Sequence, residues 1–128
     1  GPAHPGVHAL SLSTGEVVWR NDLPNKCEES PFLCWQGISA AVSSTADLVF
    51  AGGLDGILRA FDTEDGSILW ETNTRQSFGT RNGIEARGGS IESDGPVIVN
   101  GQVFITSGYE KWGEAPGNVL LVYSLNGE

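Results

Sequence analysis

The sequence predicts an all-β protein, a partial β-propeller made of four-stranded antiparallel blades. The first observation is an internal repeat, because ALSLSTGEVVW at 9–19 is matched by AFDTEDGSILW at 60–70. The second is composition: 18 Gly and 6 Pro among 128 residues, without a long helical stripe, indicate short strands and many turns. The third is that short alternating runs recur in a fixed order, which is the pattern of propeller blades.

The repeat has matched residues at its start, middle and end. These are Ala9, Gly15 and Trp19 in the first copy and Ala60, Gly66 and Trp70 in the second. We expect both glycines to adopt left-handed turns. We expect both tryptophans to be buried between neighbouring blades, each with a partner for its indole N–H. An immunoglobulin-like sandwich is the alternative, but a sandwich does not require matched Ala, Gly and Trp residues.

One complete blade is predicted at 37–71. Its four runs are GISAAVS, DLVFAGG, ILRAFD and SILWE, and the last three are separated by the turns LDG and TEDG. In the third run, Ile57, Arg59 and Phe61 alternate with Leu58 and Ala60, so two faces of one strand are expected to pack on different neighbours.

The same order is incomplete on either side of this blade. Residues 1–20 supply the last two strands of one blade, VHALSL and EVVWR. Residues 90–125 supply three strands of the next, in SIESDGPVIVN, GQVFITSG and NVLLVYSL. The chain starts and stops within a blade and contains no Met, so we expect it to be a fragment of a longer protein.

The charge balance limits the possible partners. Sixteen acidic and seven basic residues give a formal net charge of −9, which disfavours binding to nucleic acid or to an anionic membrane surface. No apolar run approaches the roughly 18–20 residues of a membrane-spanning helix, so no membrane insertion is expected.

Two cysteines, Cys27 and Cys34, lie seven positions apart in KCEESPFLC. The intervening Glu-Glu-Ser-Pro makes a turn plausible, so a disulfide is the favoured interpretation and an oxidising compartment would suit it. Free thiols remain possible. Zinc is disfavoured because two thiols are not four ligands and neither histidine has metal-type spacing to them.

The pattern Ala-x-Asp-x-x-x-Gly-x-x-x-Trp resembles the tryptophan-docking repeat of the pyrroloquinoline quinone (PQQ) propeller family. Ala60, Asp62, Gly66 and Trp70 match it fully, and the first copy has Ser11 in the Asp position. HPGVHALSLSTGEVVW, NGIEARGGSIESDGPVIVNGQVFITSGY and APGNVLLVYS resemble the C-terminal blades of the polyvinyl-alcohol-dehydrogenase-like branch of quinoprotein alcohol dehydrogenases. The resemblance covers nearly the whole chain.

This resemblance implies a PQQ-dependent oxidoreductase that oxidises alcohols, secondary or polymeric, such as polyvinyl alcohol. It also implies calcium, cytochrome c as electron acceptor, and a periplasmic or secreted location. The calcium ligands and the catalytic base are expected outside this chain, which should be inactive alone. Non-catalytic PQQ-repeat scaffolds that bind proteins carry the same motif, and a lectin-like polymer-binding propeller is a third possibility.

The candidate site is expected where long connections meet on one face. Residues 21–37 and 73–89 connect the blades, and YEKWGEAPG is inserted in the third unit; such loops on a rigid scaffold are where binding normally resides. We expect an aromatic wall, carboxylate-pairing cations and close backbone approach there, with the backbone N–H groups of Gly88-Gly89-Ser90 facing the ligand. The cofactor-binding candidates are Trp35, Gly37, Arg87, Gly88, Gly89 and Ser90.

Arg81 is a second cation that could pair with carboxylates there, and structural alternatives exist for the aromatic, cationic and paired glycine candidates. Trp35 could cover the disulfide instead of contacting a cofactor. Arg81 and Arg87 could pair with Glu85 or Glu92, and Gly88-Gly89 could form only a bend into a strand. The resemblance places Trp35 and the two glycines near the quinone in dehydrogenase relatives. No catalytic residue and no metal ligand is assigned from the sequence.

Overall fold

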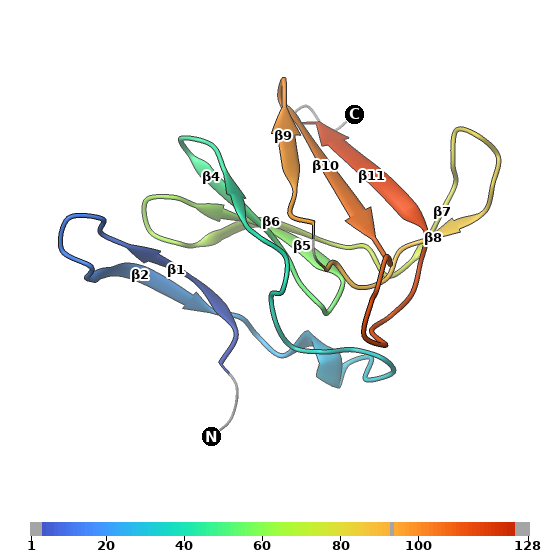
Figure 1. Ribbon diagram of the computed structural model, residues 1–128, viewed down its shortest axis with the longest axis horizontal. Helices are drawn as coiled ribbons and strands as arrows, with labels where there is room; N and C mark the ends of the chain where they lie inside the picture. The colour runs from blue at the N-terminus through green and yellow to red at the C-terminus, as the bar shows by residue number, and fades with distance from the viewer. Residues whose placement is uncertain (1–3, 93, 125–128) are drawn as a thin grey trace.

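The computed structural model describes residues 4–92 and 94–124, and in these residues the chain forms antiparallel sheets without an α-helix (Figure 1). The middle sheet has four strands in the order in which they occur in the sequence. They are β3 (Ser43–Ser44), β4 (Leu48–Gly52), β5 (Ile57–Asp62) and β6 (Ile68–Asn73). The predicted fold class, an all-β partial propeller, is confirmed.

Smaller sheets flank the middle one on two sides in Figure 1. The first sheet is the hairpin of β1 (Gly6–Leu10) and β2 (Val17–Asp22). The third has the order β11-β10-β9, with β9 (Val97–Val99), β10 (Gln102–Ser107) and β11 (Val119–Ser124). The connections carry a 3₁₀-helix, η1 (Lys26–Glu28), and a minor hairpin of β7 (Ser77–Phe78) and β8 (Ala86–Arg87). The assignment of 1–20, 37–71 and 90–125 to successive blades stays a prediction, and residues 1–3, 93 and 125 lie outside the described residues.

The two sequence repeats fold into the same hairpin. Ala9 pairs with Trp19 and Ala60 pairs with Trp70, and in both hairpins a β-bulge follows the alanine. The turn glycines also match, with φ of 75° at Gly15 and 74° at Gly66. The left-handed turns expected from the sequence are therefore present in both copies.

The two faces of β5 pack on different neighbours, as the alternation predicts. Leu58 and Ala60 belong to a core cluster with Ile91, Val103 and Ile105, on the face of β5 that packs toward the third sheet. Phe61 belongs to a second cluster with Val7 and Leu23, on the face that packs toward the first sheet. Burial of both faces stabilises the middle sheet at about 25 cal/mol per Å² of apolar surface removed from water.

The two repeat tryptophans differ in burial. Trp19 is partly buried between the first and middle sheets, and its indole N–H donates to the carbonyl oxygen of Thr63 (2.9 Å). Trp70 contacts Tyr123 of the third sheet edge to face, with 5.2 Å between ring centroids, but it is 39% exposed. The prediction that both rings are buried is confirmed only in part for Trp19 and is wrong for Trp70.

The first strand of each larger sheet is shorter than the sequence predicts. Of the run GISAAVS only its last residue, Ser43, pairs with β4, together with Ser44 that follows it. At the start of the run, the carbonyl of Gly37 instead accepts from the N–H of Leu54 (2.9 Å). Likewise, only Val97–Val99 of the run that begins at Ser90 forms a strand. The start of this run is bonded to the end of the middle sheet instead, because the N–H of Ile91 donates to the carbonyl oxygen of Gly53 (3.0 Å). Both segments cross the end of the middle sheet before they enter their strands.

Candidate functional site

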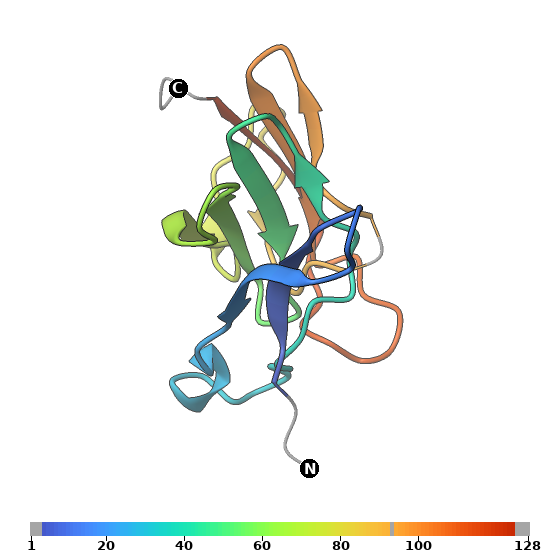
Figure 2. The ribbon, with the colours of Figure 1, turned by 90° about the vertical axis from the view of Figure 1, so that its left-hand side faces the viewer.

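The long connections gather at one end of the sheets. Figures 1 and 2 both show the segment after β2, the β5-side turn of the middle sheet and the β10–β11 loop along the lower edge, opposite the tip of the β9–β10 hairpin. The residues concerned are 23–42, 53–56 and 108–118. The β7–β8 hairpin of the connection 74–90 points away from this edge in Figure 1, so the expectation that all the long connections emerge on one face is met only in part.

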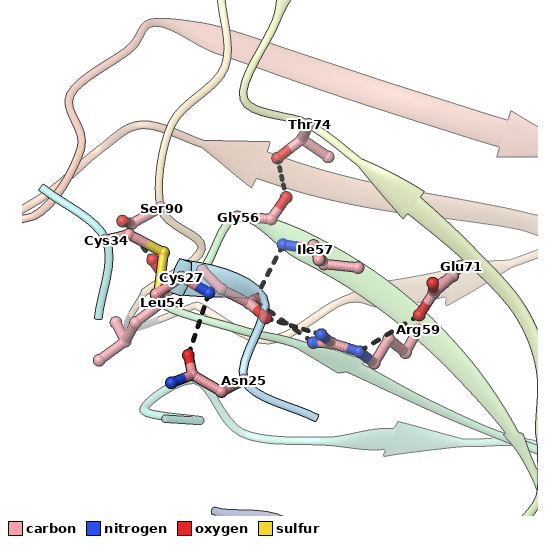
Figure 3. A network of polar contacts seen from close by, with 11 residues as sticks. Asn25, Cys27, Cys34, Leu54, Gly56, Ile57, Arg59, Glu71, Thr74 and Ser90 are labelled. Atoms are coloured by element: carbon pink, nitrogen blue, oxygen red, sulfur yellow. Dashed lines mark hydrogen bonds and ion pairs between the residues drawn. A yellow bond between two sulfur atoms is a disulfide. The ribbon is translucent and has the colours of Figure 1, made fainter. Parts of the chain in front are cut away.

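Leu54 joins two of the predicted site segments. Its N–H donates to the carbonyl of Gly37 (2.9 Å), and its own carbonyl accepts from the Oγ of Ser90 (2.6 Å). Ser90 is buried, and its Oγ also accepts from the N–H of Ala115 in the β10–β11 loop (3.1 Å). Three connections from distant parts of the sequence therefore meet around one turn of the middle sheet, and Figure 3 shows Leu54 beside Ser90.

The amides of Gly88, Gly89 and Ser90 are used inside the chain. They donate to the carbonyl of Gln76 (2.9 Å), the Oγ of Ser107 (2.9 Å) and the carbonyl of Ala115 (2.8 Å) respectively. The expectation that these N–H groups face a ligand is therefore wrong. A Cβ at Gly88 would clash with the carbonyl of Thr74, and one at Gly89 with the carbonyl of Ala115, so these glycines permit close packing of the connections.

The buried hydroxyl groups of Thr74 and Ser107 form a cluster next to Gly89. The Oγ1 of Thr74 donates to the carbonyl of Gly56 (2.7 Å) and lies 2.7 Å from the Oγ of Ser107. The Oγ of Ser107 in turn contacts both the N–H and the carbonyl of Gly89. Because buried polar groups are costly unless paired, these contacts fix the third sheet against the middle sheet at the loop end.

Arg87 presents a free guanidinium. Its backbone is tied to the β10–β11 loop, because its N–H donates to the Oδ1 of Asn118 (2.9 Å) and its carbonyl accepts from the N–H of Asn118 (2.8 Å). Its side chain is exposed and has no ion pair among residues 4–92 and 94–124. The alternative pairing with Glu85 or Glu92 is not formed among these residues, and Glu92 accepts instead from the N–H of Lys111 (3.2 Å).

Trp35 lies directly after the disulfide loop and is 55% exposed. Cys27 and Cys34 form the disulfide, as the favoured interpretation of the sequence predicted. The guanidinium of Arg75 donates to the carbonyls of Phe32 (2.6 Å) and Ser30 (3.5 Å) within the loop. At this exposure part of the indole surface is available to a flat partner.

Sequence reasoning missed a buried charge cluster at the same end. Asp55 and Arg59 are both buried and form an ion pair, with 2.6 Å between Oδ2 and Nη2, while Glu71 lies 3.6 Å from Nε of Arg59 (Figure 3). Asp55 also accepts from the N–H of Ile57 (3.1 Å), so its turn is more than an Asp-Gly bend. The available signal was an Arg at the centre of an otherwise apolar strand, because Arg is almost never fully buried unless it is paired.

Two cavities border the sheets. A polar one of about 270 Å³ lies beneath the disulfide loop and includes Lys26, Asp55, Glu71 and Arg75 in its wall. An apolar one of about 390 Å³ is lined by Trp70 of the middle sheet and by Val103 and Tyr123 of the third sheet, away from the predicted site. Within the described parts of the chain, no three His, Cys, Asp or Glu side chains are placed to hold a metal ion. No helix in these parts is long and apolar enough to cross a bilayer.

The residues present fit one side of a flat, carboxylate-bearing cofactor. The chain offers an exposed indole at Trp35, a cation at Arg87 without an ion pair in the described residues, and loops joined by Leu54 and Ser90. It does not offer free backbone amides at 88–90. Such a site would be completed by groups from outside this chain.

Comparison with known proteins agrees with the repeat and the sheet topology. The fold and the tryptophan-docking hairpins define a PQQ-repeat propeller. The family model described as outer membrane protein assembly factor BamB matches residues 33–118, and the chain belongs to this PQQ-repeat family.

The chain is also similar to alcohol dehydrogenases. It is 38% identical over 97% of its length to the polyvinylalcohol dehydrogenase of a Pseudomonas species, of which the match covers 21%. It is 28% identical over 84% of its length to the quinohemoprotein alcohol dehydrogenase ADH-IIG of Pseudomonas putida, of which the match covers 14%. The chain thus spans about a fifth or less of these relatives. The predicted resemblance to the polyvinyl-alcohol-dehydrogenase-like branch is confirmed.

A solved structure supports the fold. The crystal structure of BamB from Moraxella catarrhalis matches 98% of this chain and 33% of that chain, with a TM-score of 0.62 at 19% sequence identity.

Proposed function

We propose that this chain is part of a PQQ-dependent dehydrogenase that oxidises alcohols, with secondary or polymeric alcohols such as polyvinyl alcohol as the substrate class. The observation that carries the proposal is the meeting of Gly37 and Ser90 on Leu54. Trp35 and Arg87 lie two and three positions from this junction in the sequence. The names of the similar dehydrogenases support the same activity.

The chain's own residues bind and orient in this proposal. Arg87 pairs with a carboxylate of the quinone, and Trp35 lies along its flat face; Gly37 leaves room beside the ring. Gly88 and Gly89 act by packing the connections, and Ser90 by holding Leu54. When bound, the quinone would supply the acceptor for the hydride equivalent, two electrons and one proton, that leaves the carbinol carbon of the alcohol. The catalytic base and the calcium ligands come from outside this chain.

The electron acceptor and the location follow from the same proposal. We propose cytochrome c as the acceptor and a periplasmic or secreted location. The Cys27–Cys34 disulfide supports an oxidising compartment, because disulfides persist there and are rare in the cytosol.

The test uses a protein that carries the whole chain together with the blades that complete it. Purified protein is loaded with PQQ and Ca²⁺, and dye-linked oxidation of secondary alcohols and of polyvinyl alcohol is measured. Arg87→Gln should weaken PQQ binding about tenfold, as expected for loss of one charge-assisted pair. Arg20→Gln is the matched control, because Arg20 is an exposed residue of β2 whose ion pair, within the described part of the chain, is with Asp22.

Absence of alcohol oxidation by the loaded protein would overturn the proposal. The alternative, a non-catalytic propeller scaffold for protein binding, is supported by the description of the matching family. It would be favoured if the protein bound no PQQ yet formed a stable complex with a protein partner through this loop end.

A further inference from the structure

The disulfide loop at 27–34 is held on the sheet by polar contacts and not by a core of its own. The 3₁₀-helix at its start has no buried residue, and Phe32 at its tip is 78% exposed. The 270 Å³ polar cavity lies beneath it, between the loop and the end of β6. Because packing contributes little here, a few tethers decide where the loop lies.

Arg75 is the tether that reaches the middle of the loop. Its guanidinium donates to the carbonyls of Phe32 (2.6 Å) and Ser30 (3.5 Å), and no carboxylate competes for it among the described residues. The planar fork of an arginine can contact two carbonyls at once, which a lysine ammonium does less specifically.

The base of Arg75 is rigid. Its aliphatic stem lies so close to Gly56 that a Cβ on this glycine would clash with its Cγ. The preceding residue, Thr74, is fully buried and bonded to Gly56 and Ser107. The N–H of Arg75 donates to Asn73 (2.9 Å). The side chain therefore extends from a fixed point of the middle sheet to the loop.

Trp35 follows this loop directly and is bracketed by two anchors. Cys34 on one side belongs to the disulfide, and Gly37 on the other is bonded to Leu54. The exposed indole has no hydrogen bond of its own among the described contacts, so its place depends on where these anchors lie.

We propose that Arg75 is a positioning residue, which fixes the disulfide loop to the middle sheet and thereby sets the orientation of Trp35 toward the bound quinone. The part that concerns the quinone rests on the proposed function. The part that concerns the loop and Trp35 does not, and the two are measured separately.

The experiment compares Arg75→Gln, Arg75→Lys and Arg20→Gln in the protein with its full set of blades. Amide hydrogen exchange is followed across 28–36, and the ¹⁹F resonance of 5-fluorotryptophan at position 35 is assigned with Trp35→Phe. Arg75→Gln should accelerate exchange roughly tenfold and shift or broaden the resonance. Arg75→Lys should restore part of both effects, and Arg20→Gln should leave both as in the unsubstituted protein.

Binding of PQQ is then titrated without alcohol. Arg75→Gln should raise the Kd about three- to tenfold. Unchanged exchange and an unchanged resonance in Arg75→Gln would overturn the proposal. A loosened loop with an unaltered Kd would overturn its quinone part. A loosened loop in a protein that never binds PQQ would leave the positioning of Trp35 supported and remove the proposed function.

Discussion

The indole of Trp19 lies directly on the Cα of Gly66, across the interface between the first and middle sheets. A Cβ at position 66 would clash with the six-membered ring of Trp19, and the indole N–H donates to the nearby carbonyl of Thr63 (2.9 Å). The glycine that makes the left-handed turn of one hairpin is thus also the docking surface for the tryptophan of the previous hairpin.

Gly66→Ala should therefore be more destabilising than Gly15→Ala. Both glycines have φ near 75°, so both substitutions cost about 1–2 kcal/mol of backbone strain. Only at 66 does the new methyl meet the indole, because nothing lies within 4 Å at Gly15, and overpacking adds about 1–3 kcal/mol. Urea unfolding followed by circular dichroism measures the difference, and equal losses would contradict the docking role of Gly66.

Asp55→Asn should be strongly destabilising, by about 3–5 kcal/mol, because it leaves the buried guanidinium of Arg59 without its closest carboxylate. The double variant Asp55→Leu/Arg59→Met should recover part of the loss, since it removes the unpaired charge. Asp22→Asn is the surface control, because the Arg20–Asp22 pair is exposed and should change the unfolding midpoint little. A midpoint shift in Asp55→Asn no larger than this control would refute the prediction.

The free energy of unfolding should decrease as pH rises above about 10, because the phenol of Tyr123 ionises there. Burial raises the pKa of its phenol above the ordinary value of 10.0, although a hydrogen bond with Thr72 lowers it in part. The unfolded chain then releases this proton first as pH rises, so the contribution of Tyr123 is complete below pH 10 and is lost as pH rises through the folded pKa. Tyr123→Phe keeps the ring against Trp70 but should show a smaller alkaline loss of stability.

The control for Tyr123 is Tyr109→Phe, at an exposed phenol in the β10–β11 loop. Unfolding free energies are compared between pH 9 and pH 11. Parallel curves for Tyr123→Phe and the unsubstituted protein would show that burial of Tyr123 does not govern the alkaline limb.

Gly88→Ala should cost about 2–4 kcal/mol even without any cofactor, because its methyl would clash with the backbone carbonyl of Thr74. Gly79→Ala in the same connection has open space around it and should change stability by less than about 0.5 kcal/mol. Thermal unfolding without added PQQ distinguishes the two. A harmless Gly88→Ala would argue against its packing role.

The sequence was sufficient for the features that depend on neighbouring residues. The repeat predicted both hairpins, the turns at Gly15 and Gly66 and the alternation along β5, because strand pairing and turn chemistry are local. The spacing of Cys27 and Cys34 allowed the disulfide to be favoured for the same reason.

Features that depend on distant partners could not be predicted in this way. Whether the amide of Gly89 is free depends on Ser107, which lies 18 positions further along the chain. The partial exposure of Trp70 reflects the cavity between it and the third sheet, which no local pattern encodes. The sequence placed Arg59 on one face of its strand but did not predict its ion pair with Asp55. That pair forms only because the turn between β4 and β5 brings the two side chains to the same side of the sheet.

The bulges after Ala9 and Ala60 have a consequence for where the two indoles lie. Because the same one-residue irregularity precedes each tryptophan, both rings leave their hairpins with the same offset from the strand axis. Only the ring of Trp19 lies on the glycine turn of a following hairpin, whereas the ring of Trp70 meets Tyr123 edge to face. The shared hairpin geometry therefore delivers each indole to the neighbouring sheet, and the residue that the neighbour presents decides how deeply the ring is buried.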